Sequence, residues 1–220
     1  MRDRLASEGG FTLVELLVVI LIFAAISTSL YLAVFSGVRG GNTARNVVQI
    51  SEEARLGLNR MIRDTREAED LVAADADSYE IGIDFNLDGD TDDGGEQETF
   101  TFDPDTQRIL LTANVPDGAN PTTTEPLVVG VSALAGTNMF SYSSNQLEYD
   151  QPPEDGIASC AEIDDPPFGV SGGNGDNVCG AEELPFITNV SYALQVSSGD
   201  ARSGVRTSEF FAEAQLRNRR

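Results

Sequence analysis

Residues 10–38 read GFTLVELLVVILIFAAISTSLYLAVFSGV, and this stretch decides the class of protein. From Leu16 to Val38 it contains no charged residue. As a helix rising about 1.5 Å per residue, that run is about 35 Å long, which is sufficient to cross the apolar core of a bilayer. A buried helix of a soluble domain would keep a polar face, and a cleaved secretory signal would have a shorter apolar run. The sequence therefore predicts an N-terminal membrane-spanning helix.

Glu15 is the only charged residue in this stretch, and it follows a short leader that contains Arg2 and Arg4. A carboxylate at membrane depth is costly without a cationic partner, and such residues usually mark a functional contact. No basic residue lies between Arg4 and Arg39. The partner of Glu15 is therefore expected outside the apolar segment.

The string GFTLVELLVVI, placed after a short charged leader, resembles the class III signal peptide of type IV prepilins and pseudopilins. The resemblance implies that a prepilin peptidase cleaves between Gly10 and Phe11 on the cytoplasmic face, and that the new Phe11 amine is methylated. It also implies that Glu15 pairs with the Phe11 ammonium of a neighbouring subunit in a filament. Residues 1–10 would then be the leader peptide, and residues 11–38 the transmembrane and assembly half of a long helix.

The overall composition argues against an enzyme and against nucleic-acid binding. The chain has 14 Lys and Arg against 36 Asp and Glu, for a formal net charge of −22, and it contains no His and no Trp. Every formal cation is an Arg, because the sequence has no Lys. These absences remove Ser-His-Asp and Cys-His catalysis, Schiff-base chemistry and His-bearing zinc sites. A chain with this negative charge repels phosphate backbones, and no direct nucleic-acid partner is therefore expected.

Beyond a glycine-bearing junction at residues 39–42, a second helical segment is predicted over residues 43–71. Each glycine costs about 1 kcal/mol of helix propensity, so the junction either bends or breaks the helix. The segment is amphipathic, with most of its charges on a solvated face. Its apolar stripe consists of Val47, Ile50, Ala54, Leu58, Met61 or Ile62, Thr65 and Ala68. The string ARLGLNRMIRD at 54–64 resembles the corresponding helix of the larger minor pilins, the W-type of type IV pili and the J-type pseudopilins of type II secretion.

The remainder, residues 72–220, is expected to form a β-rich extracytoplasmic head. Alternating or β-branched stretches bounded by turn residues predict the strands. They are Ser78–Ile83, Gln97–Phe102, Gln107–Thr112, Pro126–Val131, Met139–Tyr142, Val190–Val196 and Phe210–Leu216. A long helix followed by antiparallel strands predicts an α+β, pilin-like fold in which the helix packs on a sheet.

An acidic stretch between two predicted strands, DFNLDGDTDDGGE at 84–96, could carry a calcium ion. Oxygen ligands at positions one, three and five with glycine at six match the start of an EF-hand loop, but position twelve is Gly95. The predicted ligands are Asp84, Asn86, Asp88, Asp90 and Asp92, with Glu96 or Glu98 completing the shell. The alternative is a metal-free acidic hairpin tip whose Asp and Gly residues serve turn geometry.

Cys160 and Cys179 are the only two cysteines, and they flank a segment rich in Gly, Pro, Asp and Asn. Two thiols without histidine do not make a metal site, and no base is available for a catalytic thiol. On an extracytoplasmic segment the pair is expected to form one disulfide.

Taken together, these features predict a minor pilin or pseudopilin that is assembled through its N-terminal helix, in a priming or tip complex. Its partners would be the prepilin peptidase, other pilin subunits and the cytoplasmic membrane, which the chain crosses once before entering a pilus or pseudopilus. The alternative function is a calcium-dependent adhesin or a DNA-uptake receptor displayed on the filament. The same N-terminus serves motility pili, competence pili and secretion pseudopili, so the resemblance does not select among these machines.

Overall fold

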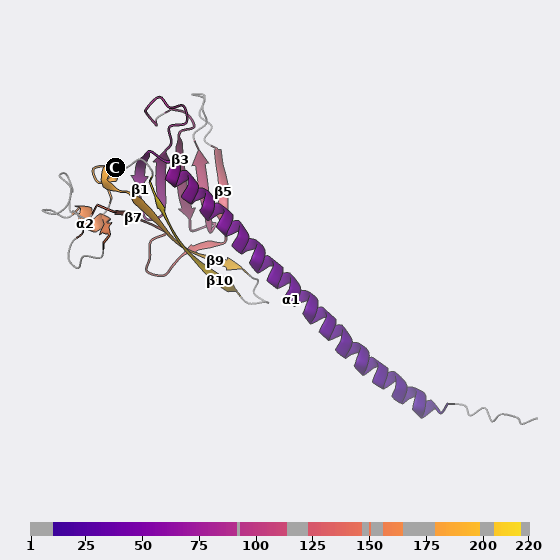
Figure 1. Cartoon of the computed structure of the whole chain (residues 1–220). Coiled ribbons are helices and arrows are strands. Elements are labelled where there is room, and N and C mark those ends of the chain that lie inside the picture. The colour runs from indigo at the N-terminus through magenta and orange to yellow at the C-terminus, as the bar shows by residue number, and fades with distance from the viewer. Residues whose placement is uncertain are drawn as a thin grey trace, which may run out of the picture. The chain divides into compact units, whose positions relative to one another are not determined.

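The computed structural model describes residues 11–91, 93–113, 123–146, 150, 156–164, 179–198 and 205–216, without the side chains of residues 42–44. The backbone divides into two compact units, Met1–Arg45 and Asn46–Arg220. Helix α1 (Leu13–Glu67) belongs to both units, and the strands follow it in the chain (Figure 1). This is the predicted α+β, pilin-like fold, in which a long N-terminal helix precedes antiparallel sheets.

The junction at Gly40 and Gly41 does not interrupt helix α1, which is continuous from Leu13 to Glu67. The sequence left open whether this junction breaks the helix. Neither glycine has an atom within 4 Å of the position that a Cβ would occupy. The helix therefore passes through the junction despite a propensity cost of about 1 kcal/mol per glycine.

The predicted end of the helix at residue 71 is wrong, because α1 ends at Glu67 and strand β1 (Asp70–Ala74) begins three residues later. The N–H of Ala68 still donates to the carbonyl of Asp64, but the N–H of Glu69 donates to Gly82 instead. Leu71 then pairs with Ile81 across the sheet and is buried. The sheet pairing thus overrides a helical pattern that continues through residues 68–71.

The first sheet has five antiparallel strands in the order β1-β2-β3-β4-β5. After β1 its strands are β2 (Ser78–Gly82), β3 (Gln97–Asp103), β4 (Arg108–Ala113) and β5 (Thr123–Val129). The strands predicted over 78–83, 97–102 and 107–112 are confirmed. The segment predicted as one strand over 126–131 is divided, because Gly130 has a positive φ of 74° and ends β5 before the short β6 (Val131–Ala133).

The second sheet runs in the order β10-β9-β7-β8, and β6 pairs with β9. Its other strands are β7 (Phe140–Ser144), β8 (Ala158–Ser159), β9 (Asn189–Ser198) and β10 (Arg206–Gln215). A short helix α2 (Cys160–Asp164) and a 3-10 turn η2 (Leu184–Phe186) lie between β8 and β9 in the chain. The alternation predicted for the last two strands is confirmed, since the predicted inward residues of β9 are buried and those of β10 are buried or half-buried.

The C-terminal part of α1 forms the core of the second unit with both sheets. The predicted stripe is buried from Ala54 onward, and Gly57 allows a close approach to the first sheet. A Cβ on Gly57 would overlap Val128 Cγ2 and would lie 2.8 Å from the carbonyl oxygen of Leu127. Glycine at this position therefore sets how closely the helix packs against β5.

Three buried hydroxyl groups connect the helix to both sheets. Thr65 Oγ1 lies 3.1 Å from the hydroxyl of Tyr79 on β2 and 2.8 Å from that of Tyr192 on β9. The two tyrosine hydroxyls are 3.2 Å apart, so the three groups form a closed ring. Burial raises the pKa of Tyr192 to about 12 and raises the pKa of Tyr79 well above its ordinary value. We call this set the hydroxyl ring.

Candidate functional site

Helix α1 begins with a side-chain cap that involves the residue predicted to act in assembly. The N–H of Glu15 donates to Thr12 Oγ1 at 3.2 Å, and the N–H of Leu16 donates to the carbonyl of Thr12. Thr12 is therefore the N-cap, and Glu15 lies at the third helical position, where a negative charge interacts favourably with the helix dipole. This local role was not predicted from the sequence, although Thr-x-x-Glu is a capping pattern. Phe11 is 79% exposed just before the cap, and the predicted cleavage residue Gly10 lies outside the described residues.

The first unit presents an apolar surface around the whole circumference of α1. Every described residue from Phe11 to Gly41 is exposed. Three hydroxyl groups in this surface bond to backbone carbonyls of their own helix: Thr28 to Ala24, Ser29 to Ala25 and Ser36 to Ala33. Polar groups satisfied within the helix are compatible with a lipid environment. Among the described residues, α1 is the one helix long and apolar enough to span a membrane.

A ladder of three side chains lies at the C-terminal end of this apolar surface. The rings of Tyr31 and Phe35 are stacked with centroids 5.7 Å apart, and Arg39 Cζ lies 4.1 Å from the centroid of Phe35. Aromatic rings and arginine are typical of the interface between lipid and water. Such a ladder is typical of the point where a helix leaves a membrane, and it ends at Arg39, the first residue of the glycine-bearing junction.

The acidic loop between β2 and β3 is organised by its first carboxylate. Asp84 accepts backbone N–H groups from Leu87, Asp88 and Gly89. These bonds close the first turn of the loop in the manner of an Asx turn. Asp84, one of the predicted calcium ligands, therefore already serves the fold of the loop.

The tip of the loop brings three carboxylates together, and only two of them are predicted ligands. Ligand atoms of Asp88, Asp90 and Asp93 all lie within 4.8 Å of one another, and the three residues are exposed. The side-chain amide of Asn86 donates to Asp88 at 2.9 Å and to Asp93 at 2.8 Å. The predicted ligand Asp92 lies outside the described residues. Asp93 was not predicted, because the EF-hand spacing points to its neighbour.

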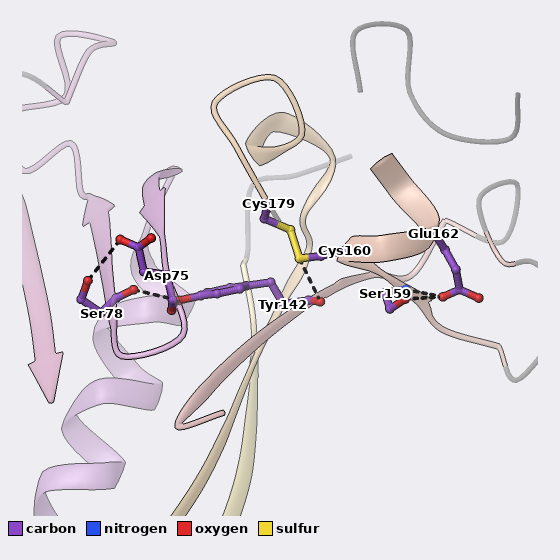
Figure 2. The surroundings of a disulfide bond; sticks show 7 residues. All are labelled: Asp75, Ser78, Tyr142, Ser159, Cys160, Glu162 and Cys179. Carbon is purple, nitrogen blue, oxygen red and sulfur yellow. Dashed lines mark hydrogen bonds between the residues drawn. A yellow bond between two sulfur atoms is a disulfide. The ribbon is translucent and has the colours of Figure 1, made fainter. Parts of the chain in front are cut away.

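The disulfide predicted between Cys160 and Cys179 is present, with the two Cα atoms 5.4 Å apart. Figure 2 shows Cys160 at the start of α2, its Sγ 3.5 Å from the carbonyl oxygen of Tyr142 on β7. The Tyr142 hydroxyl donates to the carbonyls of Asp75 and Ser78, in the turn between β1 and β2 (Figure 2). Burial raises the pKa of Tyr142. The disulfide thus lies next to a tyrosine whose hydroxyl bonds to the turn between β1 and β2. These contacts indicate a structural role for the disulfide.

One charged cluster on α1 differs from the solvated face expected there. Asp64 is 6% exposed and forms ion pairs with Arg60 at 3.4 Å and Arg63 at 2.9 Å. Arg60 also pairs with Glu125 on β5 at 2.6 Å. Burial raises the pKa of Glu98 on β3, and the Asp64 carboxylate adds to the rise. The pair of Arg60 and Glu125 joins the helix to the first sheet, whereas the two pairs of Asp64 lie within α1.

Comparison with known protein families identifies the N-terminal segment. The family model of the prokaryotic N-terminal methylation motif matches residues 5–31. The chain thus carries a type IV pilin-like class III signal, the type of segment that prepilin peptidases process. The matched residues include the cap at Thr12, the carboxylate of Glu15 and the apolar turns up to Tyr31. None of the curated proteins compared with the chain matches it.

Proposed function

We propose that this protein is a minor pilin or pseudopilin, a non-catalytic subunit that is assembled through helix α1 into a pilus or a pseudopilus. The observation that carries the proposal is the methylation motif over residues 5–31, which includes the first turns of a helix with an exposed apolar surface. Such a helix is stable in only two environments, a lipid bilayer or the apolar interior of a helical assembly. Pilin assembly uses both in succession.

Processing would create the group that Glu15 needs. Hydrolysis of the Gly10–Phe11 peptide bond releases the leader with a new carboxylate and leaves a free amine on Phe11. The amine is protonated at neutral pH, and methylation leaves it basic. Phe11 is exposed next to the start of α1, so this cation lies at the end of the helix where the Glu15 carboxylate of a neighbouring subunit can approach it. In an apolar helix bundle this pairing leaves neither the ammonium nor the carboxylate as an uncompensated buried charge.

Features of the second unit favour the assignment of this protein as a minor subunit at the end of the filament. The J-type and W-type subunits, which residues 54–64 resemble, belong to such complexes. A disulfide in the head suits an extracytoplasmic location, because disulfides persist in oxidising compartments. The protein would cross the cytoplasmic membrane once with its head outside, and the net charge of −22 favours protein partners over nucleic acid.

The test is to shear filaments from intact cells and to measure the intact mass of this protein in the sheared and membrane fractions. A chain that begins at methylated Phe11, found with the filaments, supports a pilus subunit. The same mass confined to the membrane fraction supports a short secretion pseudopilus. An uncleaved chain contradicts the proposal.

Replacing Glu15 with alanine separates processing from assembly. We expect Glu15→Ala to be cleaved normally and to be absent from the assembled fraction, because the variant retains Gly10 and Phe11. The matched control is Glu53→Ala, the same change at an exposed position further along α1, which should assemble like the unaltered protein. Normal assembly of Glu15→Ala would refute the role of the carboxylate.

A further inference from the structure

We propose that the outer edge of strand β10 binds an extended segment of another protein chain, which joins the second sheet as an additional strand. This segment carries two basic residues at alternate positions on either side of an apolar residue. The interaction involves the second unit alone, and it does not depend on the assembly of α1.

Strand β10 lies at the edge of the second sheet, and its pairing with β9 is regular. Each of its 10 residues, from Arg206 to Gln215, lies opposite one residue of β9 without a shift in register. Within the part of the chain that the structure describes, no strand pairs with the other side of β10. The backbone N–H and C=O groups on that side of an edge strand are a template for pairing with another chain.

The other edges of the two sheets have features that oppose such pairing. Strand β1 shifts its register between Leu71 and Ala73, and β5 contains Pro126, which has no N–H to donate. In the second sheet, β8 has two residues and β6 has three. Irregular register, proline and short length all protect sheet edges from other chains. Among the described edge strands, β10 is the one that lacks all three features.

The alternate side chains of β10 that point away from the core indicate the chemistry of the partner. Glu209, Phe211 and Glu213 are exposed, whereas Phe210 and Ala212 between them are half-buried. Phe211 is 68% exposed, and the two carboxylates are its neighbours on the same face of the strand. In an added strand, the residue opposite Phe211 would contact its ring, and the residues opposite the two glutamates would face negative charges. An apolar residue flanked by two basic residues therefore matches this face.

The same two carboxylates disfavour a second copy of this protein as the partner. Two antiparallel β10 strands centred on Phe211 would place Glu209 of each copy opposite Glu213 of the other. Like charges directly opposite each other destabilise a strand pair, whereas opposite charges stabilise it. In strand addition the main-chain hydrogen bonds provide affinity and the alternate side chains provide specificity. The charges of β10 thus select a different, basic chain.

The experiment is a calorimetric titration of the full chain, in nonionic detergent micelles at about 0.15 M salt, with the peptide Thr-Arg-Thr-Val-Thr-Arg-Thr. This sequence reads the same in both directions, so it presents the same side chains to β10 in a parallel or an antiparallel pair. We expect one peptide per chain. A peptide of the same composition, Arg-Arg-Thr-Val-Thr-Thr-Thr, should bind about fivefold more weakly or less, because adjacent arginines point to opposite faces of a strand.

Exchanging the charges of β10 should reverse its preference. The double variant Glu209→Arg with Glu213→Arg should bind the first peptide about tenfold more weakly and should instead bind Thr-Glu-Thr-Val-Thr-Glu-Thr. Binding of this acidic peptide also shows that the variant is folded. The matched control, Glu52→Arg with Glu53→Arg, makes the same change in net charge at exposed positions of α1. It should bind the first peptide like the unaltered chain.

Three results would overturn the proposal. The first is no binding of the first peptide by the unaltered chain at millimolar concentration. The second is equal binding of the two arginine peptides, or equal weakening in both double variants, because attraction to the overall negative charge would then account for the binding. The third comes from light scattering on the same samples: a dimer that the peptide dissociates would assign this edge to a second copy of the protein.

Discussion

The hydroxyl ring of Thr65, Tyr79 and Tyr192 leads to a prediction about the stability of the head. Replacing Tyr192 with phenylalanine removes one hydroxyl group and keeps the aromatic ring, which packs against Phe140 with centroids 6.1 Å apart. The change therefore tests the hydrogen bonds alone. In the closed ring, three hydroxyl protons suffice for three contacts, at 2.8, 3.1 and 3.2 Å.

Loss of the Tyr192 hydroxyl breaks two of these contacts and leaves one, between Thr65 and Tyr79. Each broken bond removes about 1 kcal/mol of net stability, and a buried donor left without an acceptor adds about 1–3 kcal/mol. Both remaining hydroxyls are buried, since Thr65 is 0% exposed and Tyr79 is 1% exposed, so water does not replace the lost partner. We expect Tyr192→Phe to lower the free energy of unfolding of the head by about 3–5 kcal/mol.

The assay is urea-induced unfolding of the full chain in detergent, followed by circular dichroism in the far ultraviolet. Tyr31→Phe is the matched control, because it makes the same chemical change on an exposed ring in the first unit and should leave the midpoint unchanged. A triple variant, Thr65→Val with both tyrosines changed to phenylalanine, should cost less than the sum of its single changes, since no hydroxyl is then left unpaired. A loss below about 0.5 kcal/mol in Tyr192→Phe, or strict additivity in the triple variant, would refute the reasoning.

Three further predictions concern the second unit. The free energy of unfolding of the head should fall between pH 10 and pH 12, by about 2–3 kcal/mol from Tyr192 alone. The reason is that the unfolded chain loses the phenolic proton near pH 10, whereas the folded chain keeps it up to a pKa of about 12. Urea midpoints measured across this pH range test the fall. Gly57→Ala should destabilise the head by about 1–3 kcal/mol through overlap with β5, whereas Gly40→Ala, which meets no atom within 4 Å and gains helix propensity, should not lower the same urea midpoint. Replacing Cys160 and Cys179 with serine should cost about 3 kcal/mol, because the disulfide closes a sequence separation of 19 residues; thermal unfolding with and without reductant gives the comparison.

Much of the fold was predictable because it depends on local patterns. The apolar run, the stripe from Ala54 to Ala68 and the alternation of the last two strands each follow from neighbouring residues in the sequence. The end of α1 was not predictable in this way, since residues 68–71 continue the helical pattern. Their extended conformation and the start of β1 at Asp70 depend on pairing with Gly82 and Ile81, which lie ten or more residues away. Pairing over such distances is not encoded in the local periodicity.

The candidate sites also differ in whether they depend on local sequence or on contacts between distant residues. The cysteine pair follows from composition and compartment. The place of Glu15 in the first turn is also marked locally, by the spacing from Thr12 to Glu15, although it was not predicted. The grouping of Asp93 with Asp88 and Asp90 does not, because it depends on how the loop turns after Asp84 has bonded to three backbone N–H groups. The hydroxyl ring joins residues 65, 79 and 192, and no sequence pattern marks a hydrogen bond between such distant positions.

Glu15 has two possible electrostatic roles, and their magnitudes differ enough to decide between them. At the start of α1 the helix dipole stabilises a carboxylate by about 0.3–1 kcal/mol. A charged side chain within a bilayer costs about 2.5–3.5 kcal/mol on insertion scales, which the helix end does not offset. Arg39, the next basic residue along the chain, is 24 residues away, about 36 Å along the helix axis.

The remaining cation is the amine that the proposed cleavage before Phe11 would create, so the charge of Glu15, more than the backbone bond to Thr12, should control assembly. Glu15→Gln separates the two properties, because it keeps the length of the side chain and the backbone bond to Thr12 but carries no charge. If capping were sufficient, this variant would assemble like the unaltered protein. If the charge pair is required, it should be processed and then remain in the membrane fraction, as we expect.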